Sequence, residues 1–135
     1  MGLDAYMISY TGKNKKPVDF SHDKETNEEV HYWRKHPNLE RWMSELYFEK
    51  GGKGTIDGVG GLGDYRTFNC CKVQLTEDDL ESLQEAVKRN LLPPGGGFFH
   101  GNNSDEHYRR ETLEAIERAK KEIKNKRRIY YTSWW

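Results

Sequence analysis

The stretch IYYTSWW, residues 129–135, bears most directly on the fold. Its β-branched and aromatic side chains favour a strand. Because successive side chains of a strand point to opposite faces of a sheet, these residues divide into two sets. The sets are Tyr131, Ser133 and Trp135 on one face, and Tyr130, Thr132 and Trp134 on the other. We expect one face to enter the core and the other to offer a stacking surface or an oligomer contact, since exposed aromatic side chains seldom lack a partner.

Three further strands and three helices are predicted upstream of this segment. The strands cover residues 4–10, 66–75 and 98–100, which are rich in apolar and aromatic residues. The helices run from Pro37 to about Lys50, from Thr76 to about Leu91, and from Ser104 or Asp105 to about Asn125. Each helix repeats apolar residues at a spacing of three or four. The inward stripes are Leu39, Trp42, Met43, Leu46 and Tyr47 in the first helix, Leu80, Leu83, Val87 and Leu91 in the second, and Leu113, Ile116, Ala119 and Ile123 in the third.

The alternation of strands and helices predicts an α+β fold. Its simplest form is a two-layer sandwich, with about three helices on a small four-stranded sheet. A chain of 135 residues has the usual size of one domain, so we expect residues 1–135 to form a single domain. Residues 11–29 and 51–63 are predicted to be loops, because the first is polar without periodicity and the second is rich in glycine.

Composition limits the partners and the compartment. Lys and Arg number 22, as do Asp and Glu, so the formal net charge is zero. A protein that binds long nucleic acids usually has a basic excess, so this balance argues against long polyanions and leaves small anions open. No apolar run approaches the roughly 20 residues that span a bilayer, and the first residues lead us to expect no secretory signal. The adjacent Cys70 and Cys71 indicate free thiols in a reducing cytosol.

The basic and aromatic stretch HYWRKHPN, residues 31–38, is the leading candidate for a binding surface. Arg and Lys beside Tyr and Trp can hold a phosphate and stack on a base, and the segment precedes a helix N-terminus, which favours anions. The candidate ligand-binding residues here are Tyr32, Trp33, Arg34, Lys35 and Asn38. The alternative is that Trp33 packs in the core while Arg34 and Lys35 are solvated.

A second group of candidate binding residues lies in the last third of the chain. The segment GGGFFHG, residues 95–101, places two aromatics and a histidine between glycines, which allow a ligand to approach closely. A core strand is the equal alternative. The candidate residues of this group are Phe98, Phe99, His100, Tyr108, Tyr131, Ser133 and Trp135.

Other motifs favour no catalytic or metal chemistry. Residues 58–63 match G-x-G-x-x-G, but a helix precedes them and an extended segment follows, the reverse of a dinucleotide fingerprint. The histidines lack the helical spacing that brings two metal ligands to one face. No nucleophile motif or carboxylate pair is specified. We therefore expect no catalytic residue, no metal and no cofactor.

Four segments in order resemble a family of small proteins from tailed bacteriophages and prophages. They are MGLDAY at residues 1–6, YWRK at 32–35, GFFHG at 97–101 and YYTSWW at 130–135. The likeness spans essentially the whole chain, while the glycine-rich residues 51–63 depart from the family pattern. Some members of the family carry a phosphoglycerate kinase label, for which this chain is too short. The resemblance implies a phage-derived accessory protein that acts in the bacterial cytosol.

Three functions follow as hypotheses. The first is a non-enzymatic, homo-oligomeric binder of a small anionic, nucleotide-like ligand, which in a phage setting would sequester a host immune signal. The second is a protein–protein inhibitor of a host defence or metabolic enzyme, because exposed Trp, Tyr and Arg side chains are typical interface anchors. The third is a nucleotide phosphodiesterase or other hydrolase, with acid–base candidates His31, His36, His100 and His107.

Overall fold

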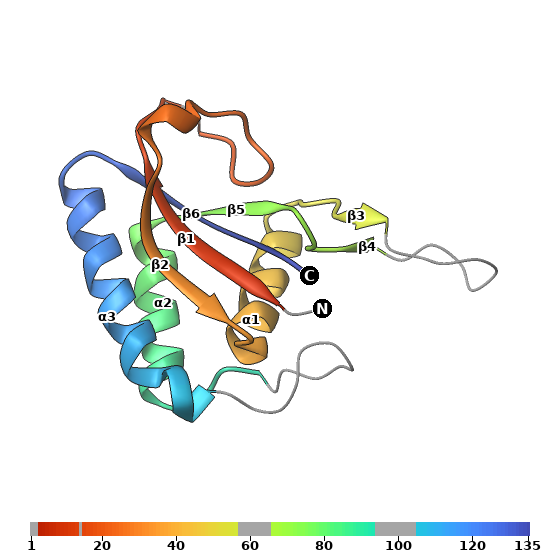
Figure 1. Cartoon of the computed structure of the whole chain (residues 1–135), viewed down its shortest axis with the longest axis vertical. Helices are drawn as coiled ribbons and strands as arrows, with labels where there is room; N and C mark the ends of the chain where they lie inside the picture. Colours follow the sequence, from red (N-terminus) through yellow and green to blue (C-terminus); the bar gives the residue numbers. More distant parts are fainter. Residues whose placement is uncertain (1–2, 14, 57–65, 94–104) are drawn as a thin grey trace.

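A four-stranded antiparallel sheet and three helices form the fold in the computed structural model, which describes residues 3–13, 15–56, 66–93 and 105–135 (Figure 1). The strand order of the sheet is β2-β1-β6-β5. These strands are β1 (Asp4–Tyr10), β2 (Glu28–Arg34), β5 (Lys72–Leu75) and β6 (Arg128–Trp134). A separate pair joins β3 (Thr55–Ile56) to β4 (Arg66–Thr67). The helices are α1 (Pro37–Glu49), α2 (Glu77–Lys88) and α3 (Asp105–Lys124), with a 3-10 turn η1 at Lys24–Thr26.

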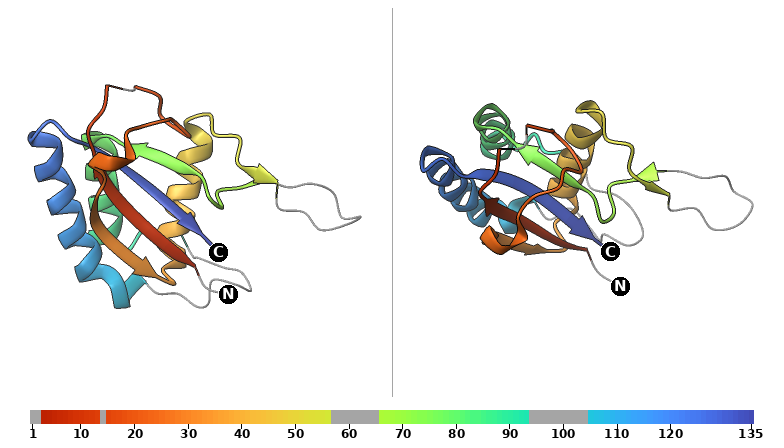
Figure 2. Two further views of the ribbon diagram at one scale, coloured as in Figure 1. Left: turned by 45° about the horizontal axis from the view of Figure 1, so that its top comes forward. Right: turned by 90° about the horizontal axis from the view of Figure 1, so that it is seen from above.

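The main sheet has one covered face and one open face. All three helices lie on the same side of the strands, as the view from above shows most clearly (Figure 2, right). The expected α+β architecture, with three helices on a four-stranded sheet, is therefore confirmed. We call the side without helices the open face.

The core lies between the sheet and the helices, and strand alternation selects its residues. On β1, Ala5 and Met7 are buried on the helix side, while Tyr6 between them is only partly covered. On β6, Tyr131 and Ser133 are completely buried, and Trp134 is 44% exposed. The division of residues 129–135 into an inner and an outer set is confirmed.

The helices begin and end close to where the sequence predicts. Pro37 is the first residue of α1, where its missing N–H costs no hydrogen bond. A capping box starts α2, in which Thr76 Oγ1 accepts from the Asp79 N–H and the Asp79 carboxylate accepts from the Thr76 N–H. The expectation that Leu91 belongs to the inward stripe is wrong. Because α2 ends at Lys88 and Asn90 adopts a φ of 54°, the chain turns and Leu91 is 60% exposed.

The strands differ from the prediction in three places. The predicted strand over residues 66–75 is two short strands, because Cys70 takes a φ of 63° and the Cys71 N–H donates to Phe68 O across a turn. The predicted loop over 11–29 contains η1 and the start of β2, and the predicted loop over 51–63 contains β3. The strand predicted at 98–100 lies outside the described residues.

Candidate functional site

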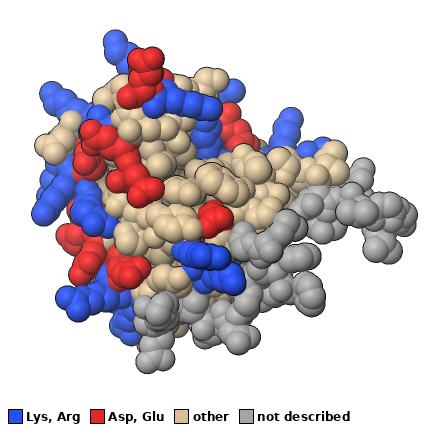
Figure 3. All heavy atoms as spheres, viewed as in Figure 1, with Lys and Arg blue, Asp and Glu red and all other residues tan. Residues whose placement is uncertain are grey.

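Three aromatic side chains form a continuous row across the open face, which we call the aromatic row. Tyr32 on β2, Tyr6 on β1 and Trp134 on β6 lie on neighbouring strands. The ring centroids of Tyr6 and Tyr32 are 4.9 Å apart, and those of Tyr6 and Trp134 are also 4.9 Å apart. Tyr32 is 37% exposed and Trp134 is 44% exposed. Figure 3 shows this side of the molecule, where residues without charge form a band over the strands.

A cavity of about 350 Å³ lies next to the aromatic row. Residues between β1 and β2 form one wall, the start of β5 forms the second, and the outer face of β6 forms the floor. Trp134 belongs to both the cavity and the aromatic row, so the two features are continuous. The lining residues are Asp19, Phe20, His22, Lys24, Cys70, Lys72, Tyr130, Thr132 and Trp134.

The Lys72 ammonium group is the principal charge in this cavity. Its Nζ lies 5.0 Å from the centroid of the Phe20 ring and 5.6 Å from that of Tyr130. Both distances are within cation–π range. Within the part of the chain that the structure describes, no carboxylate oxygen lies within 4.0 Å of this nitrogen.

His22 orients the ammonium group from inside the cavity. The His22 Nε2 lies 3.0 Å from Asn27 Oδ1, so the ring donates its proton there. The Asn27 amide nitrogen in turn donates to Tyr130 Oη at 3.3 Å, which agrees with this arrangement. The His22 Nδ1 therefore accepts from Lys72 Nζ, at 3.2 Å. The neutral imidazole holds the lysine in place without cancelling its charge.

Burial and neighbouring charge disfavour the charged forms of both groups. Desolvation lowers the pKa of Lys72, and Lys24 lowers it further, although Asp19 acts in the opposite direction. Desolvation followed by the Lys72 charge lowers the pKa of His22. Asp19 is engaged elsewhere, since its Oδ1 accepts from the Lys72 backbone N–H at 3.1 Å and its Oδ2 accepts from the Tyr47 hydroxyl. A bound anion would relieve this uncompensated positive charge.

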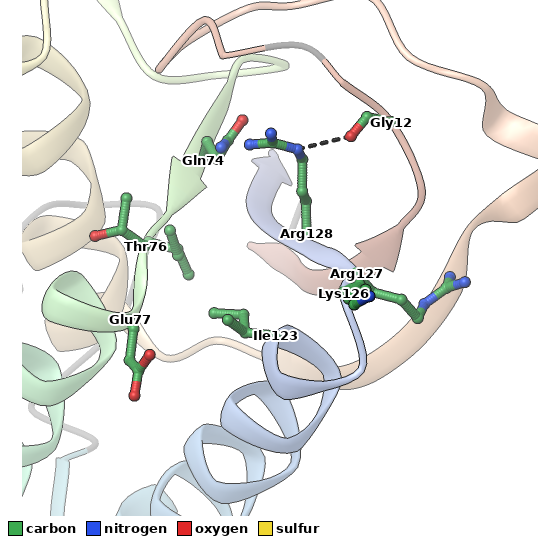
Figure 4. Close-up of a pocket in the computed structure, with 9 residues that line it drawn as sticks. Gly12, Gln74, Thr76, Glu77, Ile123, Lys126, Arg127 and Arg128 are labelled. Atoms are coloured by element: carbon green, nitrogen blue, oxygen red, sulfur yellow. Dashed lines mark hydrogen bonds between the residues drawn. The ribbon is translucent and has the colours of Figure 1, made fainter.

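A second cavity, of about 360 Å³, lies between the start of α2 and the turn from α3 into β6 (Figure 4). Two of its three basic side chains, Arg127 and Arg128, already form hydrogen bonds within the fold. Arg128 Nε donates to Gly12 O at 2.7 Å, as the dashed line in Figure 4 marks. Arg127 donates to Ser9 O at 3.1 Å and to Thr26 O. This cavity has no aromatic lining among the described residues, so it is the weaker candidate for a nucleotide-like ligand.

Four of the residues predicted to bind a ligand lie in the interior instead. The Trp33 indole N–H donates to Thr112 Oγ1 at 3.1 Å, on the helix side of the sheet. The Tyr131 hydroxyl donates to Glu40 Oε1 at 2.9 Å. Asn38 Nδ2 donates to Pro93 O at 3.1 Å, and Ser133 is also buried. None of these four presents an open surface, so a stacking role for Trp33 does not fit its position.

The other predicted residues are divided between the two faces. Tyr32 and Arg34 lie on the open face, and Lys35 follows them as an exposed residue with a φ of 59°. Tyr108 stacks on His36, with ring centroids 4.9 Å apart, and its hydroxyl donates to Arg34 O. The backbone N–H of Trp135 donates to Asn69 Oδ1 at 3.1 Å, and its side chain packs against the core. Phe98, Phe99 and His100 lie outside the described residues.

The sequence analysis did not identify the aromatic row or most of the residues that line the cavity. Tyr6 and Trp134 carried a signal, because both alternate with buried residues on strands whose other face is core. Lys72 and His22 carried none, since they are 50 residues apart and meet only through the fold.

The described residues hold no obvious metal centre and no membrane span. No group of three or more His, Cys, Asp or Glu side chains among them is placed to bind a metal ion. No helix in these parts of the chain is long and apolar enough to cross a bilayer.

Comparisons of the chain with protein family models, with curated proteins and with solved structures found no match. The class that the fold and site define is therefore stated from geometry alone: an open-faced antiparallel α+β sandwich with a positively charged cavity beside an aromatic row.

Proposed function

We propose that this protein binds a small anionic ligand with a planar ring, of the nucleotide type, on the open face of its main sheet. The observation that carries the proposal is the Lys72 ammonium group, which is half-buried between two rings and a neutral histidine with no carboxylate in contact range among the described residues. A phosphate beside Lys72 would leave the base of the same ligand within reach of Trp134 and Tyr6.

The size and charge of the site favour a small ligand over a polymer. A cavity of about 350 Å³ lies within the range of small-molecule sites. The chain carries no net charge, whereas a protein that binds a nucleic acid backbone usually has a basic excess. In the phage setting that the sequence resemblance implies, such binding without turnover would sequester a host signalling nucleotide.

Calorimetry against cyclic dinucleotides, ADP-ribose derivatives and mononucleotides tests the proposal. We expect one of these classes to bind the wild-type protein, and Lys72→Met to weaken that binding by about tenfold or more, because a charge-assisted hydrogen bond is worth roughly 1.5–3 kcal/mol. Methionine keeps the apolar stem of lysine. Lys88→Met, at an exposed position on α2, is the matched control and should bind like the parent.

Chemical labelling of cysteine gives an independent readout. Cys70 is exposed and lines the cavity, whereas Cys71 is buried, so a maleimide should modify Cys70 first. A ligand in the cavity should slow this modification. No heat with any member of the panel, or equal affinity of Lys72→Met and the parent, would remove the proposal.

A protein partner is the second candidate, because the aromatic row is exposed. Trp and Tyr are enriched among residues that dominate protein interfaces, and Trp134 and Tyr32 are the two most exposed aromatics of the open face. A pull-down from host lysate with wild type and Trp134→Ala separates the two candidates. A stoichiometric protein lost with the variant favours an inhibitor, while a co-purified small molecule favours the first proposal.

A further inference from the structure

Strand β2 forms an edge of the main sheet whose outer side has little protection. The opposite edge strand, β5, is covered by residues 17–19: the Asp19 N–H donates to Lys72 O at 3.1 Å and the Gln74 N–H donates to Pro17 O at 2.8 Å. No comparable segment of the described chain pairs with the outer side of β2. An unpaired edge is a template for another strand.

The backbone of Tyr32 points toward that outer side. The Lys35 N–H donates to Leu3 O at 2.8 Å, so Lys35 and the alternate residue Trp33 face β1. Tyr32 and Arg34 consequently direct their backbone groups away from β1. The position of the Arg34 carbonyl agrees, because it accepts from the Tyr108 hydroxyl on the outer side. No backbone group of the described chain pairs with the outward N–H and C=O of Tyr32, so a further strand can pair with them.

A bulge in β2 places opposite charges at equal distances on either side of Tyr32. On β1, the alternate residues Asp4, Tyr6 and Ile8 face Arg34, Tyr32 and Glu29 in turn, and Val30 is the extra residue. Three evenly spaced positions on the open face of β2 are thus basic, aromatic and acidic. When a second copy of the strand runs antiparallel with its Tyr32 opposite the first, the basic position of each strand lies opposite the acidic position of the other.

Among the described residues, no ion pair neutralises the two charges at the ends of this row. Neither Glu29 nor Arg34 forms an ion pair within 4.0 Å in the part of the chain that the structure describes. Asp4 faces Arg34 across the strands but accepts from the Tyr32 hydroxyl instead. Both charged side chains are exposed at the edge where a second strand would lie.

We propose that two copies of this chain form a dimer by antiparallel pairing of their β2 strands about Tyr32. Each Tyr32 exchanges backbone hydrogen bonds with its counterpart, and each Arg34 lies opposite Glu29 of the second copy. Parallel pairing would place like charges opposite one another, so the charge pattern selects the antiparallel form. The two sheets then join, and the two aromatic rows meet at the symmetry axis. This inference does not depend on the ligand proposed above.

Variants that reverse the charges of Glu29 and Arg34 test the pairing of the two β2 strands. The mass of each protein is measured by light scattering and sedimentation over a dilution series. We expect the wild-type protein to show twice the chain mass of 15.9 kDa. Glu29→Lys and Arg34→Glu should each weaken the dimer by about tenfold or more, since each creates two like-charge pairs across the strands. The double variant exchanges the charges and should restore the dimer.

Two controls keep the test decisive. Glu81→Lys changes an exposed charge on α2 by the same amount and should leave the mass unchanged. Tyr32→Pro removes the outward N–H while an edge strand tolerates proline there, so this variant should be a folded monomer by circular dichroism. A wild-type monomer throughout the series would overturn the proposal. A double variant no tighter than the single variants would overturn the register.

Discussion

At the scale of single residues, Glu40 is unusual among the described carboxyl groups because it is buried. It lies on α1 with its carboxyl group buried in the core, where Oε1 accepts from the Tyr131 hydroxyl at 2.9 Å. Burial raises its pKa from 4.5 to about 7, and the hydrogen bond from Tyr131 and the nearby Ser133 hydroxyl oppose the shift only in part. Folding therefore favours the protonated form.

The pH dependence of stability follows from this shift. Because the pKa of Glu40 is higher in the folded chain, its contribution is fully present below about pH 4.5 and is lost as the pH rises through about 7. The loss amounts to about 3 kcal/mol, at 1.36 kcal/mol for each pKa unit. We expect Glu40→Gln to have the same free energy of unfolding as the parent near pH 4.5 and a higher one above about pH 7. Urea unfolding followed by fluorescence measures both.

The contributions of the other titrating groups to the free energy of unfolding cancel when the variant and the parent are compared at the same pH. The glutamine oxygen can still accept from Tyr131, so the packing is preserved. Glu81→Gln, at an exposed position, is the control and should run parallel to the parent. If the difference between Glu40→Gln and the parent stays constant with pH, Glu40 ionises in the folded protein as it does in the unfolded chain.

At the scale of elements, the start of α2 is determined by a capping signal in the local sequence. Its capping box joins Thr76 to Asp79, and the Asp79 carboxylate also accepts from the Lys50 ammonium group at the end of α1. We expect Thr76→Ala to lower the free energy of unfolding by about 1 kcal/mol, because one helix N–H loses its partner. Thr76→Ser keeps the hydroxyl and should lie close to the parent. Equal losses in the two variants would show that the methyl group, not the cap, is responsible.

Helices and strands differed in how well the sequence predicted them, and β2 shows why. Helix α1 combines Pro37 with an apolar stripe, and both signals depend only on nearby residues. Strand β2 is an edge with charged ends and a bulge, so its alternation of buried and exposed residues is interrupted. Edge strands need fewer apolar residues, so the sequence of residues 31–38 predicts a binding segment but not the strand that carries it.

The candidate site also has a part that a local sequence pattern predicts and a part that it does not. Alternation predicts the two sets of side chains on β6, but it does not say which set faces outward, and the candidate residues Tyr131 and Ser133 belong to the buried set. Lys72 gains its role from Phe20 and His22, which reach it from a polar segment without periodicity. Such a contact depends on the path of a long connection, and no local pattern encodes it.

At the scale of the whole molecule, the segment from β4 to β5 links the small strand pair to the main core. Phe68 stacks on Tyr131, with centroids 5.8 Å apart, and packs edge-on against Tyr47 at 4.9 Å. The Cys71 thiol lies beside this cluster, with its Sγ 3.6 Å from Asn69 O. Although Cys71 is next to a turn, its side chain belongs to the core that the sheet and helices share.

The reactivity of Cys71 should therefore report the opening of the whole core. In a Cys70→Ser variant, Cys71 is the remaining thiol, and burial raises its pKa, which further suppresses the reactive thiolate. We expect its alkylation rate to rise with urea along the same slope as global unfolding, because reaction requires the aromatic cluster around it to separate. A much shallower slope would mean that the turn at residues 68–71 opens locally while the sheet stays intact. In that case, the cavity wall next to Lys72 would move independently of the core beneath it.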